Sequence, residues 1–115
     1  MNHARRRACA ARKIGNQSES VVSAALDFLK RLGLIASFRR EDRPGVDFFV
    51  TFKDSRTVPL QVKSSDAKAA QHYALYPEIA VVTVRHNCAN LPPREFDRLA
   101  RRAQNDIARI FCLTR

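Results

Sequence analysis

Two apolar runs separated by a short polar turn constrain this chain more than any other feature of its sequence. Residues 45–52 and 58–65 are rich in Val, Phe and Thr, and the polar residues 53–57 lie between them, so the pattern predicts a β-hairpin. Side chains alternate between the two faces of a strand, and one face of each strand is apolar. The apolar side chains are Val46, Phe48, Val50 and Phe52 on the first strand and Leu60 and Val62 on the second.

Three polar side chains, Asp47, Gln61 and Lys63, occupy the alternate positions of this hairpin. If both apolar faces pack on one core, these polar side chains converge beyond it. Asp47 lies opposite Gln61 or Lys63 only if the connecting loop has an odd number of residues or the strand pair carries a bulge. Carboxylate and amide oxygens are ligands for a hard divalent cation, and a lysine amine can neutralise a phosphoryl oxygen or position a water molecule.

Two segments of the hairpin resemble the motifs of a known enzyme group. Pro44-Gly-Val-Asp47 stands as the "PD" element and Gln61-Val-Lys63 as the "(D/E)XK" element of the PD-(D/E)XK nuclease superfamily. The chain departs from that pattern twice. Gly45 and Val46 separate the proline from Asp47, and Gln61 replaces the second acidic residue, which lowers the negative charge of the site.

A second feature supports the same resemblance. Residues 16–32 have the apolar periodicity of an amphipathic helix, and Glu19 lies at the edge of its apolar stripe, where a carboxylate needs a partner or a metal ion. An alternative is a capping box with Asn16 as N-cap and Glu19 at N3. The order of Gly15-x-x-x-Glu19, an apolar helix and the hairpin resembles archaeal-type Holliday junction resolvases of the same superfamily, whose first helix brings a Glu to the metal site.

The resemblance covers about residues 14–85 and implies a set of roles. It implies a catalytic set of Glu19, Asp47, Gln61 and Lys63. Mg²⁺, or alternatively Mn²⁺, would be held by Asp47, the Gln61 side chain and a backbone carbonyl near Val62, with Glu19 at the edge or at a second ion. Lys63 would orient the attacking water or neutralise the transition state.

The remaining pattern completes an α/β fold. We expect a strand over 34–40, a turn over 41–45, a short helix over 66–71, a strand over 79–84 and a last helix that opens at Pro93. This order predicts a central mixed β-sheet flanked by helices on both faces. It agrees with a restriction-endonuclease-like αβββαβ core plus a C-terminal helix. We expect one nuclease-like domain over residues 14–115, preceded by a basic flexible arm over residues 1–13.

The charge of the chain predicts a polyanionic partner. The formal net charge is +10 over 115 residues, which favours nucleic acid, with an anionic membrane surface as the alternative. The candidate contacts to nucleic acid are Arg5, Arg6, Arg7, Arg12, Lys13, Arg39, Arg40, Arg43, Ser64 and Ser65. Each has a structural alternative: the arm can be merely solubilising, the strand arginines a solvated edge, and the serines caps of the helix that follows. His72, Tyr73 and Tyr76 can stack on bases or fill the gap between helix and sheet.

Cysteine usage and hydropathy bear on the compartment. Cys9, Cys88 and Cys112 have no metal-ligand spacing, so we expect free thiols rather than a site shared with His86. No apolar stretch approaches membrane-spanning length, and the Arg5-Arg-Arg7 run is not followed by an apolar signal segment. We therefore expect a cytoplasmic protein that does not bind membranes.

These features together predict a metal-dependent endonuclease that hydrolyses phosphodiester bonds. DNA is the expected substrate and RNA the alternative. Because the charge pattern contains no base-reading element, we expect structure-selective or partner-directed cutting. The alternative function is a catalytically inactive nucleic-acid-binding module that retains the nuclease fold, which Gln61 favours. A basic RNA- or ribosome-associated domain would leave Glu19 and Asp47 without a shared purpose. Paired cuts would require a homodimer or a partner nuclease.

Overall fold

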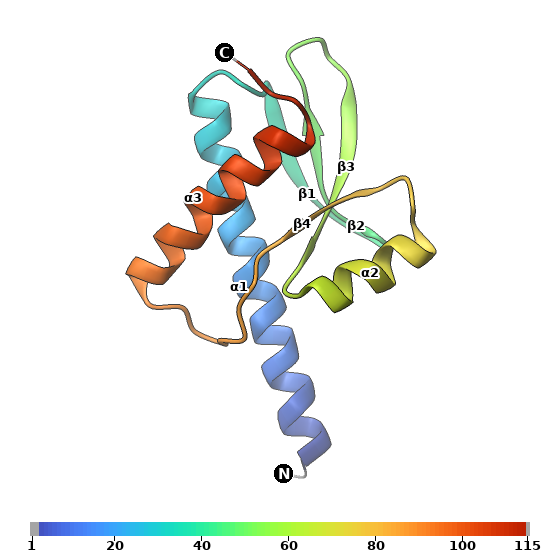
Figure 1. Ribbon diagram of the computed structural model, residues 1–115, viewed down its shortest axis with the longest axis vertical. Coiled ribbons are helices and arrows are strands. Elements are labelled where there is room, and N and C mark those ends of the chain that lie inside the picture. The colour runs from blue at the N-terminus through green and yellow to red at the C-terminus, as the bar shows by residue number, and fades with distance from the viewer. Residues whose placement is uncertain (1–2, 115) are drawn as a thin grey trace.

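The computed structural model describes residues 3–114, and the side chains of residues 12–114. Its elements follow the predicted order of helix, three strands, short helix, strand and helix. They are α1 (His3–Arg31), β1 (Ser37–Arg43), β2 (Val46–Thr51), β3 (Thr57–Lys63), α2 (Asp66–Leu75), β4 (Ala80–Thr83) and α3 (Pro93–Ile110). The chain therefore has the predicted α/β architecture with a mixed sheet (Figure 1).

The sheet has the strand order β1-β2-β3-β4, and only its last pair is parallel. β1 pairs with β2 and β2 with β3 in antiparallel fashion, as expected of strands joined by short turns. α2 forms the crossover that lets β4 return parallel to β3. The free edge of β4 is partly closed by α2, because the Val81 amide donates a hydrogen bond of 3.1 Å to the Tyr73 hydroxyl.

The register of the β2–β3 hairpin confirms the predicted face pattern. Phe48 pairs with Leu60 and Thr51 with Thr57, and the loop between the strands consists of residues 52–56, an odd number. The even-numbered residues of β2 are buried and the odd-numbered residues are half-buried. The same register, continued one step beyond its last pair, brings Asp47 to the level of Gln61.

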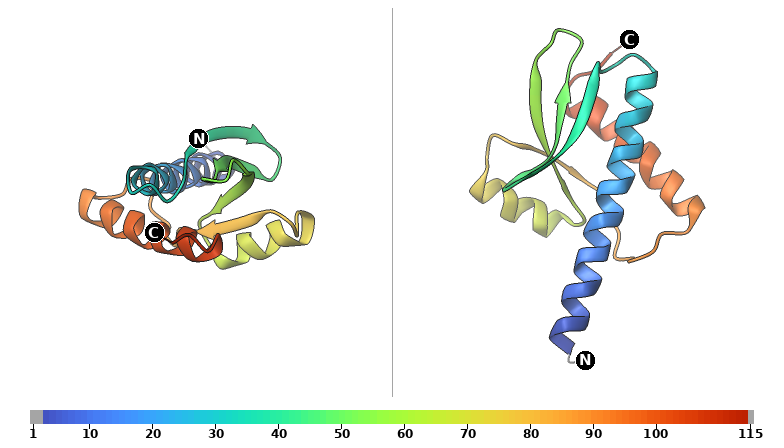
Figure 2. Two further views of the ribbon diagram at one scale, coloured as in Figure 1. Left: turned by 90° about the horizontal axis from the view of Figure 1, so that it is seen from above. Right: turned by 180° about the vertical axis from the view of Figure 1, so that it is seen from behind.

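The core lies between one face of the sheet and the helices α1 and α3, which pack against each other (Figure 2). It contains Phe48 and Leu60 from the hairpin together with Leu26 and Leu29 from α1 and Ile107 from α3, all fully buried. The opposite side of β3 carries Gln61, which is also buried, and α2 packs there with Ala69 and His72. One side of β3 therefore packs in the hydrophobic core, and the other side faces a polar site.

Helix α1 begins much earlier than the predicted helix over 16–32. The structure places residues 3–13, the segment expected to form a basic arm, in α1, and residues 1–2 lie outside the described part. Alanine and arginine are good helix formers, and this segment is rich in both. The capping-box alternative for Glu19 is wrong, because Asn16 lies inside α1 and no N-cap can form there. Within the part of the chain that the structure describes, no helix combines the length and apolarity needed to cross a membrane.

The C-terminal end of α1 follows the prediction. The amide of Leu34 donates to the Leu29 carbonyl at 3.0 Å and that of Gly33 to the Lys30 carbonyl at 3.0 Å, while Gly33 has a φ of +76°. This is a Schellman motif with glycine in the left-handed position. Pro93 likewise stands in the first turn of α3, where its missing N–H costs nothing.

Three predicted boundaries are displaced. β1 runs over 37–43 instead of 34–40, because Arg43 still pairs with Val46 after a register shift and only residues 44–45 turn the chain. α2 continues to Leu75, beyond the predicted end at 71. β4 occupies 80–83 of the predicted 79–84, and its two central residues are buried. The ends of these helices and strands depend on strand pairing and on packing between residues far apart in the sequence, so local propensity does not predict them.

Candidate active site

All four residues predicted for the site line one cavity at the end of the β2–β3 pairing. Glu19 comes from α1, Asp47 from β2, and Gln61 and Lys63 from β3, around a volume of about 240 Å³. The cavity forms there because the backbone pairing of β2 with β3 ends at Phe48 and Leu60, so the strands diverge just before Asp47. α1 crosses this fork and supplies the remaining wall, which includes Gly15 and Ser18.

Asp47 is held in place by the backbone of the neighbouring strand. Its Oδ2 atom accepts a hydrogen bond of 2.8 Å from the amide of Val62. The carboxylate thus takes the position that a backbone carbonyl of β2 would occupy if the pairing continued. One oxygen of Asp47 is fixed by this bond, and its other lone pairs remain for a ligand in the cavity.

Glu19 is half-buried beside Asp47, and its acidity is strongly altered. Burial, and then Asp47 both as a hydrogen-bond partner and as a like charge, together raise the pKa of Glu19 to about 7. The positive charge of Arg40 opposes this rise. With a pKa of about 7, the Glu19 carboxyl group holds a proton part of the time at neutral pH, and a cation bound beside it would displace that proton.

Gln61 brings an amide oxygen that has no hydrogen-bond partner among the described residues. The side chain is 7% exposed, and its Oε1 atom is buried without a hydrogen-bond donor. A buried amide oxygen without a partner costs free energy, on the order of 1–3 kcal/mol. Such an atom next to two carboxylates is a ready ligand for a bound cation or water.

Lys63 supplies a positive charge beside these oxygens, and Lys68 on α2 supplies a second one. Both lysines line the cavity, and the Lys68 amine donates a hydrogen bond of 3.3 Å to the Ser64 hydroxyl. The cavity lining therefore combines two carboxyl groups with two amines. This arrangement can bind a divalent cation and a phosphate side by side.

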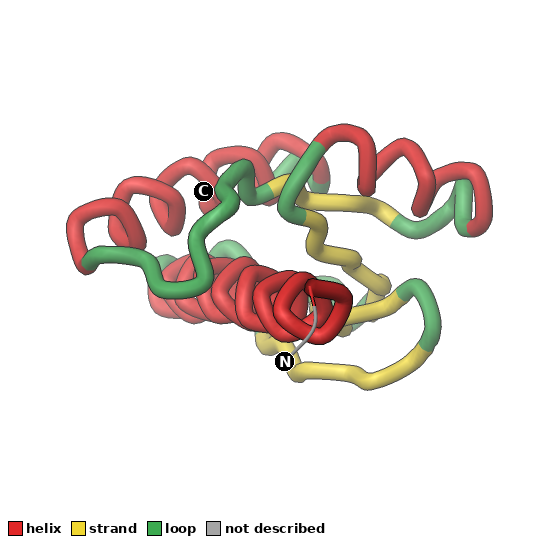
Figure 3. Tube along the Cα trace, turned by 90° about the horizontal axis from the view of Figure 1, so that it is seen from below, coloured by secondary structure: helices red, strands yellow, loops and turns green. Residues whose placement is uncertain are grey.

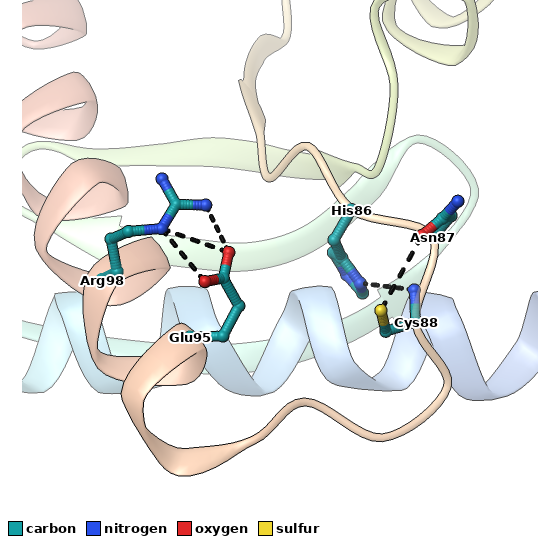
Figure 4. A network of polar contacts seen from close by, with 5 residues as sticks. All are labelled: His86, Asn87, Cys88, Glu95 and Arg98. Carbon is teal, nitrogen blue, oxygen red and sulfur yellow. Dashed lines mark hydrogen bonds and ion pairs between the residues drawn. The ribbon is translucent and has the colours of Figure 1, made fainter.

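A hydrogen-bonded chain connects α1 to the loop after β4, which passes beside α1 (Figure 3). The Cys88 amide donates to His86 Nδ1 at 3.3 Å (Figure 4), so the proton of the neutral imidazole is on Nε2. His86 Nε2 lies 2.7 Å from the Ser18 hydroxyl, which in turn donates to the Ile14 carbonyl at 3.1 Å. Ser18 is an acceptor for His86 in this arrangement and is not activated as a nucleophile. The pair fixes the α1 turn that carries Glu19.

The predicted nucleic-acid contacts fall into several groups. The Arg39 and Arg43 guanidinium groups lie 4.6 Å and 5.6 Å from the centre of the Phe49 ring, and both form ion pairs with Glu41. They lie on an exposed strand edge, and Glu41 neutralises part of their charge. Arg40 is the strand arginine nearest the site, because it lines a cavity with Glu19 and Asp47.

The remaining predicted contacts lie on helices or beside the cavity. Ser65 caps α2 by accepting the Lys68 amide at 3.2 Å, as its structural alternative predicted. Ser64 lines the cavity. Arg12 and Lys13 are exposed on α1, whereas the side chains of Arg5, Arg6 and Arg7 lie outside the described part of the structure.

Sequence reasoning assigned no role to Lys68 or Ser18 and expected His72 to stack on bases or to pack between helix and sheet; Lys68 and Ser18 line the site cavity and His72 adjoins it. Lys68 and His72 are four positions apart on α2 and therefore lie on the same face of the helix. This i, i+4 spacing is the sequence signal that could have indicated a shared role. Ser18 is adjacent to Glu19 in sequence, but its partner His86 comes from a distant loop and no local signal indicates it. Gly45 has a φ of +80°, and a Cβ there would lie 2.9 Å from the Tyr76 ring, so the turn before Asp47 requires glycine.

The cavity has fewer acidic ligands than a metal site built from charged side chains alone. Within residues whose side chains the structure describes, no group of three or more His, Cys, Asp or Glu side chains is placed to hold a metal ion. Cys88 and Cys112 are free and exposed. Any cation here would thus combine Glu19 and Asp47 with the neutral oxygens of Gln61 and the backbone. No protein-family model, no curated protein and no solved structure matches this chain.

Proposed function

We propose that this protein is a metal-dependent endonuclease that hydrolyses phosphodiester bonds in DNA, with the restriction-endonuclease-like fold of the PD-(D/E)XK superfamily. The observation that carries the proposal is the meeting of Glu19, Asp47, Gln61 and Lys63 in one cavity, from three separate elements. The net charge of +10 supports a polyanionic substrate. The small cavity and the lack of a base-reading element favour cutting directed by nucleic-acid structure or by a partner.

The donor set fits a divalent cation such as Mg²⁺ or Mn²⁺. Asp47, the Gln61 amide oxygen and the Val62 carbonyl would hold the ion, with Glu19 at its edge. Two features support this fit: the Gln61 Oε1 atom is buried without a donor, and the pKa of Glu19 is raised to about 7 by burial and by Asp47. The unpaired Gln61 oxygen and the burial of Glu19 beside Asp47 both leave electron-rich oxygens that a cation would coordinate.

The chemistry is then divided among the side chains of the cavity. A divalent cation held by Asp47, Gln61 and the Val62 carbonyl would lower the pKa of a water molecule and neutralise charge on the phosphate. Lys63 donates a charged hydrogen bond to a phosphoryl oxygen or holds the attacking water in line. Glu19, with a pKa of about 7, can accept a proton at neutral pH. Asp47 stays oriented throughout by the Val62 amide.

A second candidate function, an inactive nucleic-acid-binding module with the same fold, is favoured by one observation. Gln61 leaves the cavity with two acidic side chains, and among the side chains described for residues 12–114 no group of three or more His, Cys, Asp or Glu is placed to hold a metal ion. In that case the cavity would bind a phosphate without cutting it.

The decisive experiment is a cleavage assay on duplex, branched and single-stranded DNA, with Mg²⁺, Mn²⁺ or a chelator. Lys63→Ala should reduce the cleavage rate by about two to three orders of magnitude, because the lost donor acts on the transition state. Asp47→Ala should also abolish cleavage. Gln61→Glu should preserve or raise activity at low Mg²⁺, because a carboxylate holds the ion more tightly than an amide.

Lys53→Ala is the matched control, since Lys53 is an exposed lysine in the turn at the opposite end of the hairpin. It removes the same charge and should leave cleavage unchanged. If the wild type and every variant share one background rate in all three conditions, the chain is not a nuclease and the inactive binding module takes its place.

A further inference from the structure

A second cavity adjoins the candidate active site on the side of α2. Its volume is about 440 Å³, and it shares Gln61, Lys63 and Lys68 with the first cavity. The walls that it does not share include His72 and Tyr76. Because the two cavities have three lining residues in common, a polymer lying across the first one continues directly into the second.

The charge around this second cavity differs from that on the other side of the site. Its lining contains Lys63 and Lys68 and no acidic residue. The cavity toward β1 is instead lined by Glu41 and Asp42 together with the two carboxyl residues of the site, opposed only by Arg40. A phosphodiester chain therefore meets two amines without a carboxylate among the lining residues on the α2 side, and a mixed set of charges on the β1 side, where Glu41 pairs with Arg39 and Arg43.

Two polar atoms in residues that line the second cavity have no hydrogen-bond partner within the described part of the chain. His72 is 4% exposed and Gln61 is 7% exposed, and both His72 Nε2 and Gln61 Oε1 are buried without a hydrogen bond. Leaving a buried polar group unpaired is costly, and native proteins rarely do so away from sites that bind a ligand or water. His72 is also packed against the Tyr76 ring, with centroids 5.3 Å apart, so its position is fixed.

The opening of the cavity is apolar on one side. Leu75 is 75% exposed, and it lines the cavity next to Tyr76. An exposed leucine beside a half-buried tyrosine offers a surface for a sugar or a base, whereas the lysines suit a phosphate. The combination matches a nucleotide better than an isolated anion.

We propose that this second cavity binds the nucleotide next to the scissile phosphate, on the α2 side. Lys63 and Lys68 neutralise its phosphate, His72 Nε2 forms a hydrogen bond to it, and Leu75 and Tyr76 contact the sugar or base. The proposal rests on the proposed nuclease function, since it places the substrate strand relative to the cleaved bond. It also assigns a direction: the strand leaves the site toward α2 and away from Glu41 and Asp42.

Binding without cleavage tests this cavity independently of catalysis. The affinity of a short single-stranded DNA oligonucleotide is measured by fluorescence anisotropy in a chelator, for the wild type, Lys68→Ala and Lys53→Ala. Loss of a charged hydrogen bond should weaken binding by about tenfold in Lys68→Ala. Lys53→Ala removes the same charge far from the cavity and should change the affinity by less than about twofold.

Histidine NMR provides the second readout, because the chain has only three histidines. The oligonucleotide should shift the ring signals of His72, which a His72→Asn variant identifies. Inorganic phosphate at the same concentration should shift them far less, since it offers nothing to Leu75 and Tyr76. Saturation by inorganic phosphate alone would mean a free-phosphate site and would overturn the nucleotide assignment.

The outcomes separate this inference from the nuclease proposal. If the wild type cuts DNA while Lys68→Ala and Lys53→Ala bind equally and His72 does not respond, the second cavity is not a nucleotide site. If Lys68→Ala loses binding and His72 responds while no protein cuts DNA, the cavity assignment holds for the inactive binding module and the nuclease proposal fails.

Discussion

The carboxylate of Asp47 replaces a strand partner for Val62. Its Oδ2 atom accepts the Val62 amide at 2.8 Å just beyond the point where β2 and β3 stop pairing. One side chain therefore completes the hydrogen bonding of the sheet and presents a charged oxygen to the cavity. Asp47 therefore has a structural role, as the acceptor for the Val62 amide, and a chemical role, as a negative charge in the cavity. Substitutions that remove only one of these properties can separate the two roles.

Asp47→Asn should separate them. The Asn side-chain oxygen can still accept the Val62 amide, so the free energy of unfolding should change by about 1 kcal/mol or less, whereas Asp47→Ala should cost about 1–3 kcal/mol by leaving a buried amide unpaired. Asn removes the negative charge, so metal-dependent cleavage should be lost in both variants. Urea unfolding and the cleavage assay measure the two effects. Equal destabilisation by Asn and Ala would show that the charge, and not the hydrogen bond, holds the strand.

Glu19 should make the metal-free protein less stable as the pH rises. The pKa of Glu19 in the folded state is about 7, above its ordinary value of 4.5, so the folded state binds this proton more tightly than the unfolded state. Its contribution to stability is complete below the unfolded pKa and is lost as the pH rises through about 7. Thermal unfolding between about pH 5 and pH 8 should show this loss in the wild type.

Glu19→Gln is the control for that titration, because glutamine resembles the protonated acid and does not titrate. The difference in Tm between the variant and the wild type should grow with pH. Addition of Mg²⁺ should reduce the difference, since the ion replaces the proton. A difference that stays constant from pH 5 to pH 8 would contradict the raised pKa.

Gly45→Ala should destabilise the turn that leads into Asp47. Gly45 has a φ of +80°, and an added Cβ would lie 2.9 Å from the Tyr76 ring, so both strain and a clash follow, for a cost of about 1–3 kcal/mol. Gly15→Ala is the contrasting variant. A Cβ at Gly15 meets no atom within 4 Å, and the helical position should gain about 0.5–1 kcal/mol. Chemical unfolding of both variants checks the opposite signs.

His86 should make the protein less stable in mild acid. Burial lowers the pKa of His86 below its ordinary 6.5, so the unfolded state binds the proton more readily. The stability that neutral His86 contributes is present above about pH 6.5 and is lost as the pH falls through the lowered pKa. His86→Gln does not titrate, so the difference between its Tm and that of the wild type should change in this range. His72 also has a lowered pKa, but it is common to both proteins and cancels.

Removal of residues 1–13 should weaken binding to DNA without unfolding the domain. These residues carry Arg5, Arg6, Arg7, Arg12 and Lys13 and no acidic residue. Among the residues with described side chains, burial on α1 begins only after them, with Ser18 the first fully buried one. The slope of log affinity against log salt should fall by at most about 4.5 units. An unchanged slope would show that the segment makes no phosphate contacts.

Local sequence determined the arrangement of the hairpin. Alternation of apolar residues over 46–52 assigns Asp47 to the polar face, and an odd-numbered loop places it opposite Gln61 or Lys63, of which the observed register selects Gln61. The order of the elements and the glycine that ends α1 at Gly33 follow from residue patterns within a few positions. These properties depend on backbone geometry and periodicity, which neighbouring residues dictate.

The tertiary structure decided the chemistry of the site. Whether Glu19 faces solvent, caps its own helix or meets Asp47 depends on how α1 crosses the sheet, and its raised pKa exists only because that packing buries it beside a second carboxyl group. The role of α2 depends in the same way on the β3–β4 crossover, which brings Lys68 and His72 beside Lys63. Burial and charge proximity are properties of residues far apart in the chain, so no local pattern encodes them.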